Sequence, residues 1–357
     1  MRKMMVLILA ALFLGSVATV VSTTSMAAEQ AKPITLTAAF PQPDPSFLSE
    51  QYKWWANEFG KRTGGKVTIK SHWMQSLVKY KDALPSVQSR FVDIAYLGAV
   101  YHPSNLPYFM MVDTLYNCDQ DYVAAMLAVF DTVDNEPHVK AELEKNKIVM
   151  LANYHGGQCQ MGSKKCISSV KDLQKKSIRT MGGVRAEFHK ALGATPVPLI
   201  MTDIYEAVDR GTIDMWADVG IMPVHIDKID QVAPCIFMAS YGSPLCYGVF
   251  MNADVFKGLP KDVQEMIPKL RRDFGIRFAQ TLMDLEESFF KEDEQKYGVK
   301  RIYPSAEDKK ILREAGQKAN EIFIKQQEAS GHKGAGDVVA YYTKALKKYE
   351  AERAKKK

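Results

Sequence analysis

The chain has 357 residues, of which 46% are hydrophobic and 25% are charged, and its formal net charge is +6. A chain of this length exceeds what one hydrophobic core usually holds, so we expect two lobes. Much of the positive charge lies in a basic C-terminal helix or tail over 341–357. Such a run is usually a solvated helix end, so the charge gives no reason to expect nucleic acid as a partner.

The first residues predict an export signal. Arg2 and Lys3 precede an almost wholly apolar run over 6–21, which is shorter than a membrane-spanning helix requires. Small residues up to Ala27 then form a signal-peptidase site. We predict a signal peptide over 1–27, cleaved after Ala27 or Ala28, and a periplasmic mature protein. No later segment reaches 18 uninterrupted apolar residues, so we expect a mature protein that is not embedded in a membrane.

Beyond this leader, the apolar pattern alternates between short strands and helices. We predict strands at 34–40, from 67 onward, at 92–97, 147–154, 177–180 and 246–252, and one more strand that follows a turn at 211–216. We predict helices that begin at Ser46 and that span 80–91, 186–192, 204–209 and 261–290. This alternation is typical of an α/β fold with a mostly parallel sheet. Because no flexible linker is present, we expect strands that cross between the two lobes to join them.

No catalytic or cofactor motif stands out in the sequence. Residues 60–66 fit the first seven places of a phosphate-binding loop, but the segment ends a predicted helix and precedes a strand, the reverse of the required order. The seven histidines are scattered, so we predict neither a metal site nor a cofactor. Export permits disulfides, but the odd number of cysteines leaves at least one unpaired and the pairing open. The five are Cys118, Cys159, Cys166, Cys235 and Cys246.

Four segments in the middle of the chain carry a specific pattern. Residues 172–179 read DLQKKSIR, 192–198 read LGATPVP, 203–207 read DIYEA and 211–214 read GTID. In order and spacing, these segments resemble the DctP-like periplasmic binding proteins of TRAP transporters. Weaker similarity on either side extends the resemblance over most of the mature chain.

The resemblance implies a solute-binding protein and not an enzyme. Its expected fold is α/β, a two-lobed periplasmic binding protein of the type II-like class, with crossing hinge strands and a long bracing helix. The lobes close on a small organic anion, which is handed to a membrane permease with a small and a large subunit. We assign 28–156 plus about 244–284 to lobe I and 157–243 plus about 285–340 to lobe II, and we expect a monomer.

The resemblance assigns the ligand's acid group to Arg179, which lies near the end of a predicted strand. Ligands of open α/β folds bind beyond the carboxyl ends of the strands, and a guanidinium can donate two parallel hydrogen bonds to a carboxylate or sulfonate. Cys159 stands where many members have a second arginine, Asp218 where an asparagine usually contacts the ligand, and Met201 where an aromatic residue is common. We therefore expect a monocarboxylate, hydroxy acid, sulfonate or zwitterion, with a donor facing Asp218, in preference to a dicarboxylate.

Further lining residues are predicted on weaker grounds, from their places at strand ends and in loops that face the cleft. They are Phe40, Asp44, Trp73, Tyr96, Gln158 and Trp216. One alternative function is the receptor of an ATP-driven importer or a signalling system. Another is an exported hydrolase or lyase with Cys159 as nucleophile, but His155 on the same predicted strand would lie about 13 Å away, beyond proton-transfer reach.

Overall fold

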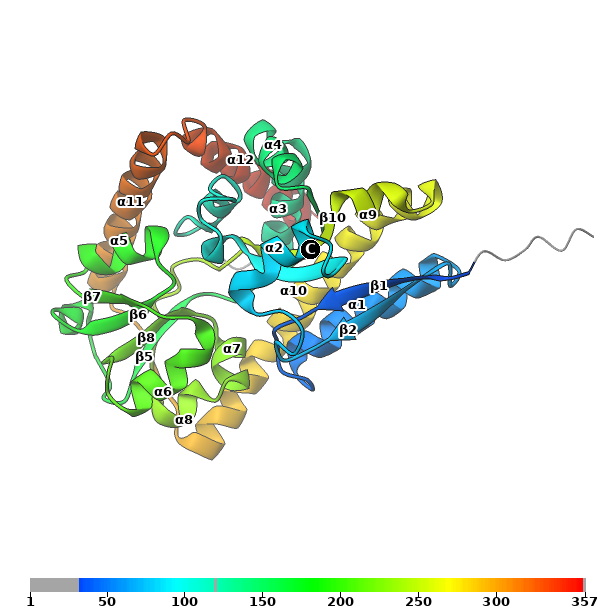
Figure 1. Ribbon diagram of the computed structural model, residues 1–357. Coiled ribbons are helices and arrows are strands. Elements are labelled where there is room, and N and C mark those ends of the chain that lie inside the picture. Colours follow the sequence, from blue (N-terminus) through cyan, green and yellow to red (C-terminus); the bar gives the residue numbers. More distant parts are fainter. Residues whose placement is uncertain (1–31, 119–120, 356–357) are drawn as a thin grey trace, which may run out of the picture. The chain divides into compact units, whose positions relative to one another are not determined.

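Two β-sheets flanked by helices form the described part of the computed structural model (Figure 1). The structure describes residues 32–118 and 121–355, so the predicted signal peptide lies outside the described residues. The strands are β1 (Ile34–Ala39), β2 (Val67–His72), β3 (Ile94–Gly98), β4 (Ile148–Asn153), β5 (Gln160–Ser163), β6 (Ser177–Thr180), β7 (Thr195–Pro198), β8 (Met215–Val219), β9 (Cys235–Phe237), β10 (Tyr247–Asn252) and β11 (Lys300–Ile302).

The helices flank these sheets, and short 3-10 turns precede or follow several of them. They are α1 (Phe47–Arg62), α2 (Ala83–Gln88), α3 (Tyr122–Asn135), α4 (Pro137–Lys145), α5 (Gly183–Ala191), α6 (Ile204–Asp209), α7 (Ile221–Ile226), α8 (Ile229–Val232), α9 (Ala253–Gly258), α10 (Lys261–Tyr297), α11 (Ala306–Ala329) and α12 (Ala335–Ala354). None of the helices in the described ranges is long and apolar enough to cross a membrane.

The strand order shows that the chain passes repeatedly between the sheets. Sheet A has the order β2-β1-β3-β10-β4, and sheet B has the order β11-β9-β5-β8-β6-β7. The chain leaves sheet A after β4, returns to it as β10, which pairs antiparallel with β3 and β4, and enters sheet B again as β11. This topology confirms the predicted α/β class and the crossing segments.

Helix α10 connects the regions of the two sheets. At 37 residues it is about 55 Å long, and it contacts α1, α3 and β4 as well as α7 and α8. It ends at Gly298, whose left-handed backbone (φ 67°) is typical of a helix C-cap. The predicted bracing helix is therefore confirmed, with a longer C-terminal end. The residues from Pro33 onward form one compact unit, and the lobe boundaries stay a prediction.

Local sequence signals account for the elements around the site. Ser46 and Ser49 form a capping box that starts α1 directly after the proline-rich loop 41–45. The predicted helix at 80–91 is shorter, because a 3-10 turn over 80–82 precedes α2. Strands β5, β7, β9 and β11 were not predicted, and strands of three or four residues show a period poorly.

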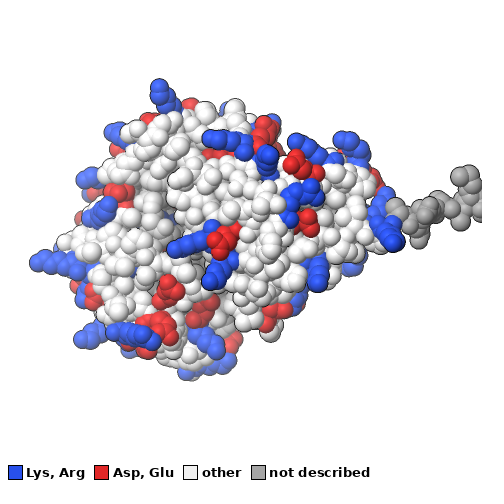
Figure 2. Space-filling view, in the orientation of Figure 1, with Lys and Arg blue, Asp and Glu red and all other residues white. Residues whose placement is uncertain are grey.

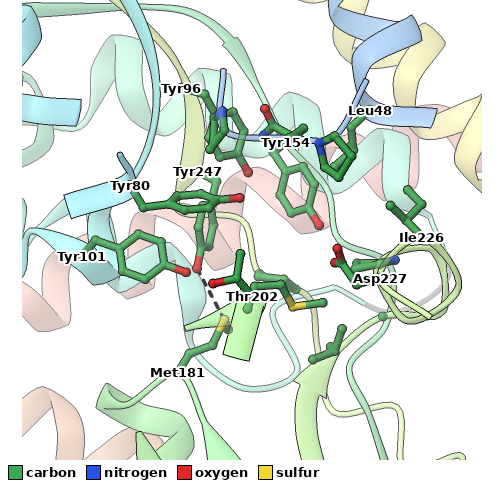
Figure 3. A pocket seen from close by; sticks show the side chains of 18 of the residues that line it. Leu48, Tyr80, Tyr96, Tyr101, Tyr154, Met181, Thr202, Ile226, Asp227 and Tyr247 are labelled. Atoms are coloured by element: carbon green, nitrogen blue, oxygen red, sulfur yellow. Dashed lines mark hydrogen bonds between the residues drawn. The ribbon is translucent and has the colours of Figure 1, made fainter. Parts of the chain in front are cut away.

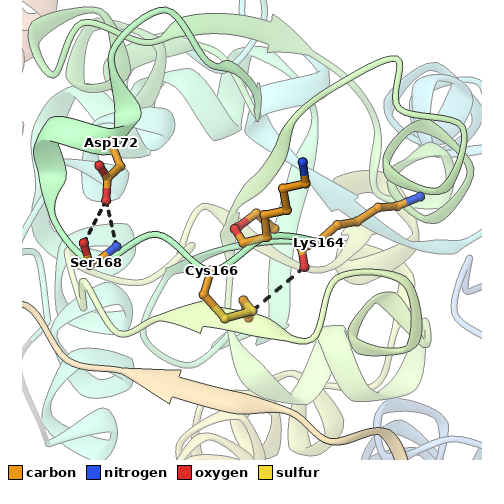
Figure 4. The surroundings of a disulfide bond; sticks show 7 residues. Lys164, Cys166, Ser168 and Asp172 are labelled. Carbon is orange, nitrogen blue, oxygen red and sulfur yellow. Dashed lines mark hydrogen bonds between the residues drawn. A yellow bond between two sulfur atoms is a disulfide. The ribbon is translucent and has the colours of Figure 1, made fainter.

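One disulfide, between Cys166 and Cys235, joins two segments 69 residues apart (Figure 4). This settles the pairing that the sequence leaves open, and it suits an oxidising compartment. Cys159 and Cys246 are buried outside this bond. On the face shown in Figure 2, residues of both charge signs are interspersed, with no extended patch of one sign.

Candidate binding cavity

A cavity of about 270 Å³ lies between elements of the two sheets. Its walls carry five tyrosines, which come from separate segments on the sheet A side: Tyr80, Tyr96, Tyr101, Tyr154 and Tyr247. Segments of sheet B and the helices beside it supply the opposite wall, which includes Arg179, Met201 and Asp227. Figure 3 shows side chains from both walls turned toward the same space, and the Tyr247 hydroxyl bonds Met181 Sδ across it at 3.4 Å.

Arg179 reaches the cavity from β6 and is oriented by backbone carbonyls. Its Nε donates to Leu199 O at 3.0 Å and its Nη1 to Ala217 O at 3.0 Å. The residue is only 2% exposed, and within the described ranges it forms no ion pair and Nη2 has no hydrogen-bond partner. The charge of Arg179 helps to lower the pKa of Asp218, but a guanidinium that is held on one side and forms no direct ion pair is suited to a carboxylate or sulfonate.

Asp227, in the turn after α7, is an acidic lining residue that sequence reasoning missed. Its carboxylate makes neither a hydrogen bond nor an ion pair with the described residues, and it faces the cavity (Figure 3). Burial raises its pKa to about 6. At neutral pH the Asp227 side chain is therefore mostly an unpaired anion. A cationic or hydrogen-bond-donating group of a ligand would offset the cost of burying this charge. A lone aspartate in a turn carries no motif, so no sequence signal identified it.

Gln42 is a second missed residue, in the loop after β1 that sequence analysis did expect to face the cleft. It is 2% exposed and lines the cavity, yet neither its Nε2 nor its Oε1 has a hydrogen-bond partner among the described residues. Leaving a buried polar group unpaired costs about 1–3 kcal/mol. A ligand that both donates and accepts hydrogen bonds would satisfy this amide.

The cavity tyrosines experience charges of both signs. Burial raises the pKa of Tyr101, and the charge of Arg179 opposes this rise. Burial also raises the pKa of Tyr80 and of Tyr154, and here the carboxylate of Asp227 adds to the rise. Groups of both charges thus act on the aromatic rings of the cavity, and the faces of such rings attract cations.

Asp218 lines the cavity, but its carboxylate is already occupied. Oδ1 accepts hydrogen bonds from His189 Nε2 at 2.9 Å and from the Tyr241 hydroxyl at 2.8 Å. Oδ2 accepts from the Thr180 hydroxyl at 2.8 Å and from Met181 N at 3.1 Å. Burial alone would raise the pKa of Asp218, but the charge and hydrogen bond of His189 hold it below its usual value. The expectation that Asp218 faces a donor of the ligand is therefore corrected, because four internal donors occupy it.

Arg185, on α5, is another buried cation, but it does not line the binding cavity. It is 1% exposed, and its three guanidinium nitrogens have no hydrogen-bond partner in the described chain. Burial lowers the pKa of the Arg185 guanidinium, but the nearby Cys159, Asp113 and Asp218 outweigh burial, so that the pKa is raised overall. Arg185 shares a separate cavity of about 10 Å³ with Asp113, which is room for about one water molecule. The cation that the sequence lacks at position 159 is therefore not replaced within the lining of the binding cavity.

Of the remaining predicted residues, some line the cavity and others do not. Met201 and Tyr96 line the cavity. Phe40 and Trp73 are not in its lining and stack on each other, with ring centroids 4.6 Å apart. Trp216 is fully buried, and a Cβ on the neighbouring Gly162 would lie 2.2 Å from its indole, so it packs within sheet B instead of capping a ligand.

Three further predicted residues lie outside the cavity lining. Asp44 forms an ion pair with Lys53 at 2.5 Å. Gln158 donates to Cys118 O at 2.9 Å and accepts from Gly242 N at 3.1 Å. Cys159 is fully buried. None of the three lines the cavity as described, so the structure does not bring them to the site.

The geometry does not support a cysteine nucleophile. Burial raises the pKa of the Cys159 thiol to about 12, whereas a nucleophilic cysteine needs a lowered pKa and some exposure. Burial also lowers the pKa of His155 to about 3, and its ring stacks on Tyr122 with centroids 4.2 Å apart.

Comparisons with known proteins agree with the observed fold. The DctP family model, described as bacterial extracellular solute-binding protein, family 7, matches residues 41–327. A TRAP solute-binding protein from a marine metagenome, specific for aromatic acid ligands and solved with 3-hydroxybenzoate, superimposes with a TM-score of 0.78 at 20% identity, covering 89% of this chain and 99% of that one. A TRAP periplasmic solute-binding protein from Desulfovibrio salexigens gives 0.75 at 21% identity, covering 89% and 97%.

Among curated proteins, the ectoine-binding periplasmic protein TeaA of Halomonas elongata is 29% identical over 119 residues. This match covers 33% of the chain and only about a third of the relative, 34% of its length.

Proposed function

Because the chain belongs to family 7 of the bacterial extracellular solute-binding proteins, we propose that it captures a small organic acid outside the cytoplasm and delivers it to a TRAP permease. The permease partner has a small and a large membrane subunit. In this proposal the leader over 1–27 is removed on export, and the mature protein works in the periplasm as a monomer.

The observation that carries this proposal is the unpaired, oriented guanidinium of Arg179 in the cavity. Two backbone carbonyls fix its Nε and Nη1, so an incoming anion does not have to order the side chain. A buried charge without a partner is costly, and an acid group of the ligand removes that cost. This holds for a carboxylate and for a sulfonate.

Asp227 and Gln42 extend the proposal to the other end of the ligand. An unpaired carboxylate, an unpaired amide and several tyrosine rings together suit a cationic or strongly donating group. We therefore propose a small zwitterion with a single acid group, whose anionic end binds Arg179 and whose cationic end faces Asp227. Ectoine, the ligand in the name of the Halomonas relative, belongs to this chemical class.

Capture is proposed to occur by lobe closure. Lobe I would comprise 28–156 plus about 244–284, and lobe II 157–243 plus about 285–340. Gln42 and Tyr247 would then contact the ligand from lobe I, and Arg179 and Asp227 from lobe II. A ligand that contacts both lobes favours the closed state by its differential affinity for that state.

A thermal-shift screen tests the proposal. The panel contains zwitterions with one carboxylate, neutral-ended monocarboxylates and sulfonates of the same size, aromatic acids, and dicarboxylates. We expect zwitterions to raise the melting temperature most, since ligand binding stabilises the native state. A rise with dicarboxylates alone would contradict the ligand class, and no rise with any acid would contradict the function.

Delivery requires a separate assay. Proteoliposomes that contain the small and large permease subunits and a sodium gradient should accumulate the labelled ligand only when this protein is added. Uptake that instead requires an ATPase would favour the receptor of an ATP-driven importer.

A further inference from the structure

Outside the cavity, a histidine and two aspartates meet where α7 and α8 pack against α10. His225 lies in the last turn of α7, Asp230 lies in α8, and Asp293 lies near the C-terminal end of α10. One potential ligand atom from each lies within 4.8 Å of the other two. Within residues 32–118 and 121–355, this is the one group of three or more such residues with ligand-like spacing.

The charges in this group are not balanced by the protein. Asp230 is 1% exposed and Asp293 is 2% exposed. His225 Nδ1 lies 2.7 Å from Asp293 Oδ1, but neither oxygen of Asp230 has a hydrogen-bond partner among the described residues. No described lysine or arginine forms an ion pair with either aspartate. A buried carboxylate without a partner is among the costliest groups in a fold.

Asp230 and Asp293 are both buried and lie within ligand distance of each other. Two adjacent buried carboxylates need a proton or a cation between them.

We propose that His225, Asp230 and Asp293 bind a divalent cation of the zinc type. One imidazole nitrogen and two carboxylate oxygens suit Zn²⁺, with a water molecule in the fourth position, whereas Ca²⁺ and Mg²⁺ prefer oxygen ligands only. Ligand atoms around tetrahedral zinc lie about 3.3 Å apart, so separations near the 4.8 Å limit have to shorten, and the 2.7 Å between His225 Nδ1 and Asp293 Oδ1 has to lengthen. The stacking of His225 on Phe289, with centroids 4.8 Å apart, holds the imidazole in place.

Such a metal would connect the binding cavity to the long helix. Pro223, Ile226 and Asp227 line the cavity, and they lie in the same α7–α8 segment as His225 and Asp230. A cation that joins this segment to Asp293 of α10 would fix one cavity wall. The site is therefore structural in this proposal, and it does not depend on the identity of the ligand.

Zinc titration of the full mature chain, free of any affinity tag and stripped with a chelator, tests the proposal. We expect calorimetry with ZnCl₂ to give one Zn²⁺ per chain and a higher melting temperature, with no comparable effect from MgCl₂ or CaCl₂. Asp230→Asn and His225→Gln should each weaken binding at least about tenfold. His138→Gln is the matched control, because His138 pairs with the buried Glu136 at 2.9 Å and belongs to no such group of three.

The following outcomes would contradict the zinc proposal. If the wild-type chain binds no zinc, or binds magnesium or calcium as tightly, the proposal is wrong. It is also wrong if both variants bind zinc as the wild type does. A melting temperature that rises in Asp230→Asn without any zinc binding by the wild type would show that a shared proton occupies the site.

Discussion

The exchange Asp227→Asn should move stability and affinity in opposite directions. Burial raises the pKa of Asp227 from 3.8 to about 6, and each pKa unit corresponds to about 1.4 kcal/mol. The ionised side chain therefore costs up to about 3 kcal/mol at neutral pH, and we expect the amide to recover about 1–3 kcal/mol. Because the folded pKa lies above the unfolded one, this gain is complete above about pH 6 and disappears below about pH 4.

The same exchange should weaken the binding of a zwitterion. The amide cannot supply the charge that pairs with the cationic end, and a hydrogen bond to a charged group is worth about 1.5–3 kcal/mol. This corresponds to roughly a 10- to 150-fold loss of affinity, whereas a monocarboxylate of the same size should bind unchanged.

Thermal unfolding at pH 7.5 and pH 4 and calorimetry with both ligands measure these two effects. Asp218→Asn is the matched control, because its carboxylate accepts four internal hydrogen bonds. Losing that buried charge should destabilise the protein by about 3–5 kcal/mol. The reasoning is refuted if Asp227→Asn destabilises the protein at pH 7.5, or if it binds the zwitterion as tightly as the wild type does.

Three further outcomes follow from the structure. Zwitterion affinity should fall by up to about tenfold per pH unit below pH 6, where Asp227 becomes protonated; constant affinity from pH 7.5 to 5 would contradict this. Replacing both Cys166 and Cys235 by alanine should cost about 2–4 kcal/mol in denaturant unfolding, because their bond closes a loop of 69 residues; an unchanged midpoint would show that the bond does not contribute. Gln42→Met should reduce affinity severalfold without lowering the melting temperature, since its amide has no internal partner to lose; a destabilised variant with unchanged affinity would exclude the proposed contact.

Sequence reasoning succeeded where the signal was local or came from the family pattern. The apolar runs located β1, β4 and β10, and β6 was also predicted. The binding role that the DctP-like segments imply for Arg179 stays a prediction. The long apolar period over 261–290 identified α10. The DctP family match over 41–327 confirms the resemblance.

Sequence reasoning failed where long-range partners decide a role. Asp218 looked available because nothing in the neighbouring sequence shows that His189, 29 residues earlier, donates to it. Its left-handed backbone (φ 62°) is one that aspartate and asparagine tolerate better than most residues, which gives a structural reason for the residue type. The five cavity tyrosines come from separate segments, so no spacing along the chain reveals them.

The loop after β1 contributes to the cavity lining, but through other residues than the two named from the sequence. Phe40 and Asp44 were expected to face the ligand, but Phe40 stacks on Trp73 and Asp44 pairs with Lys53. Gln42 between them lines the cavity. The direction of a side chain in an irregular loop depends on backbone angles, and the sequence pattern does not specify them.

Calorimetric titration of the best zwitterion into the wild type and into Arg179→Ala tests the central claim most directly. Loss of the guanidinium would leave the ligand's acid group buried and unpaired, at a cost of about 3–5 kcal/mol. We expect affinity to fall by a hundred- to several-thousand-fold, with a cooperative unfolding transition retained and partial recovery in Arg179→Lys. Binding by Arg179→Ala within about fivefold of the wild type would contradict the account.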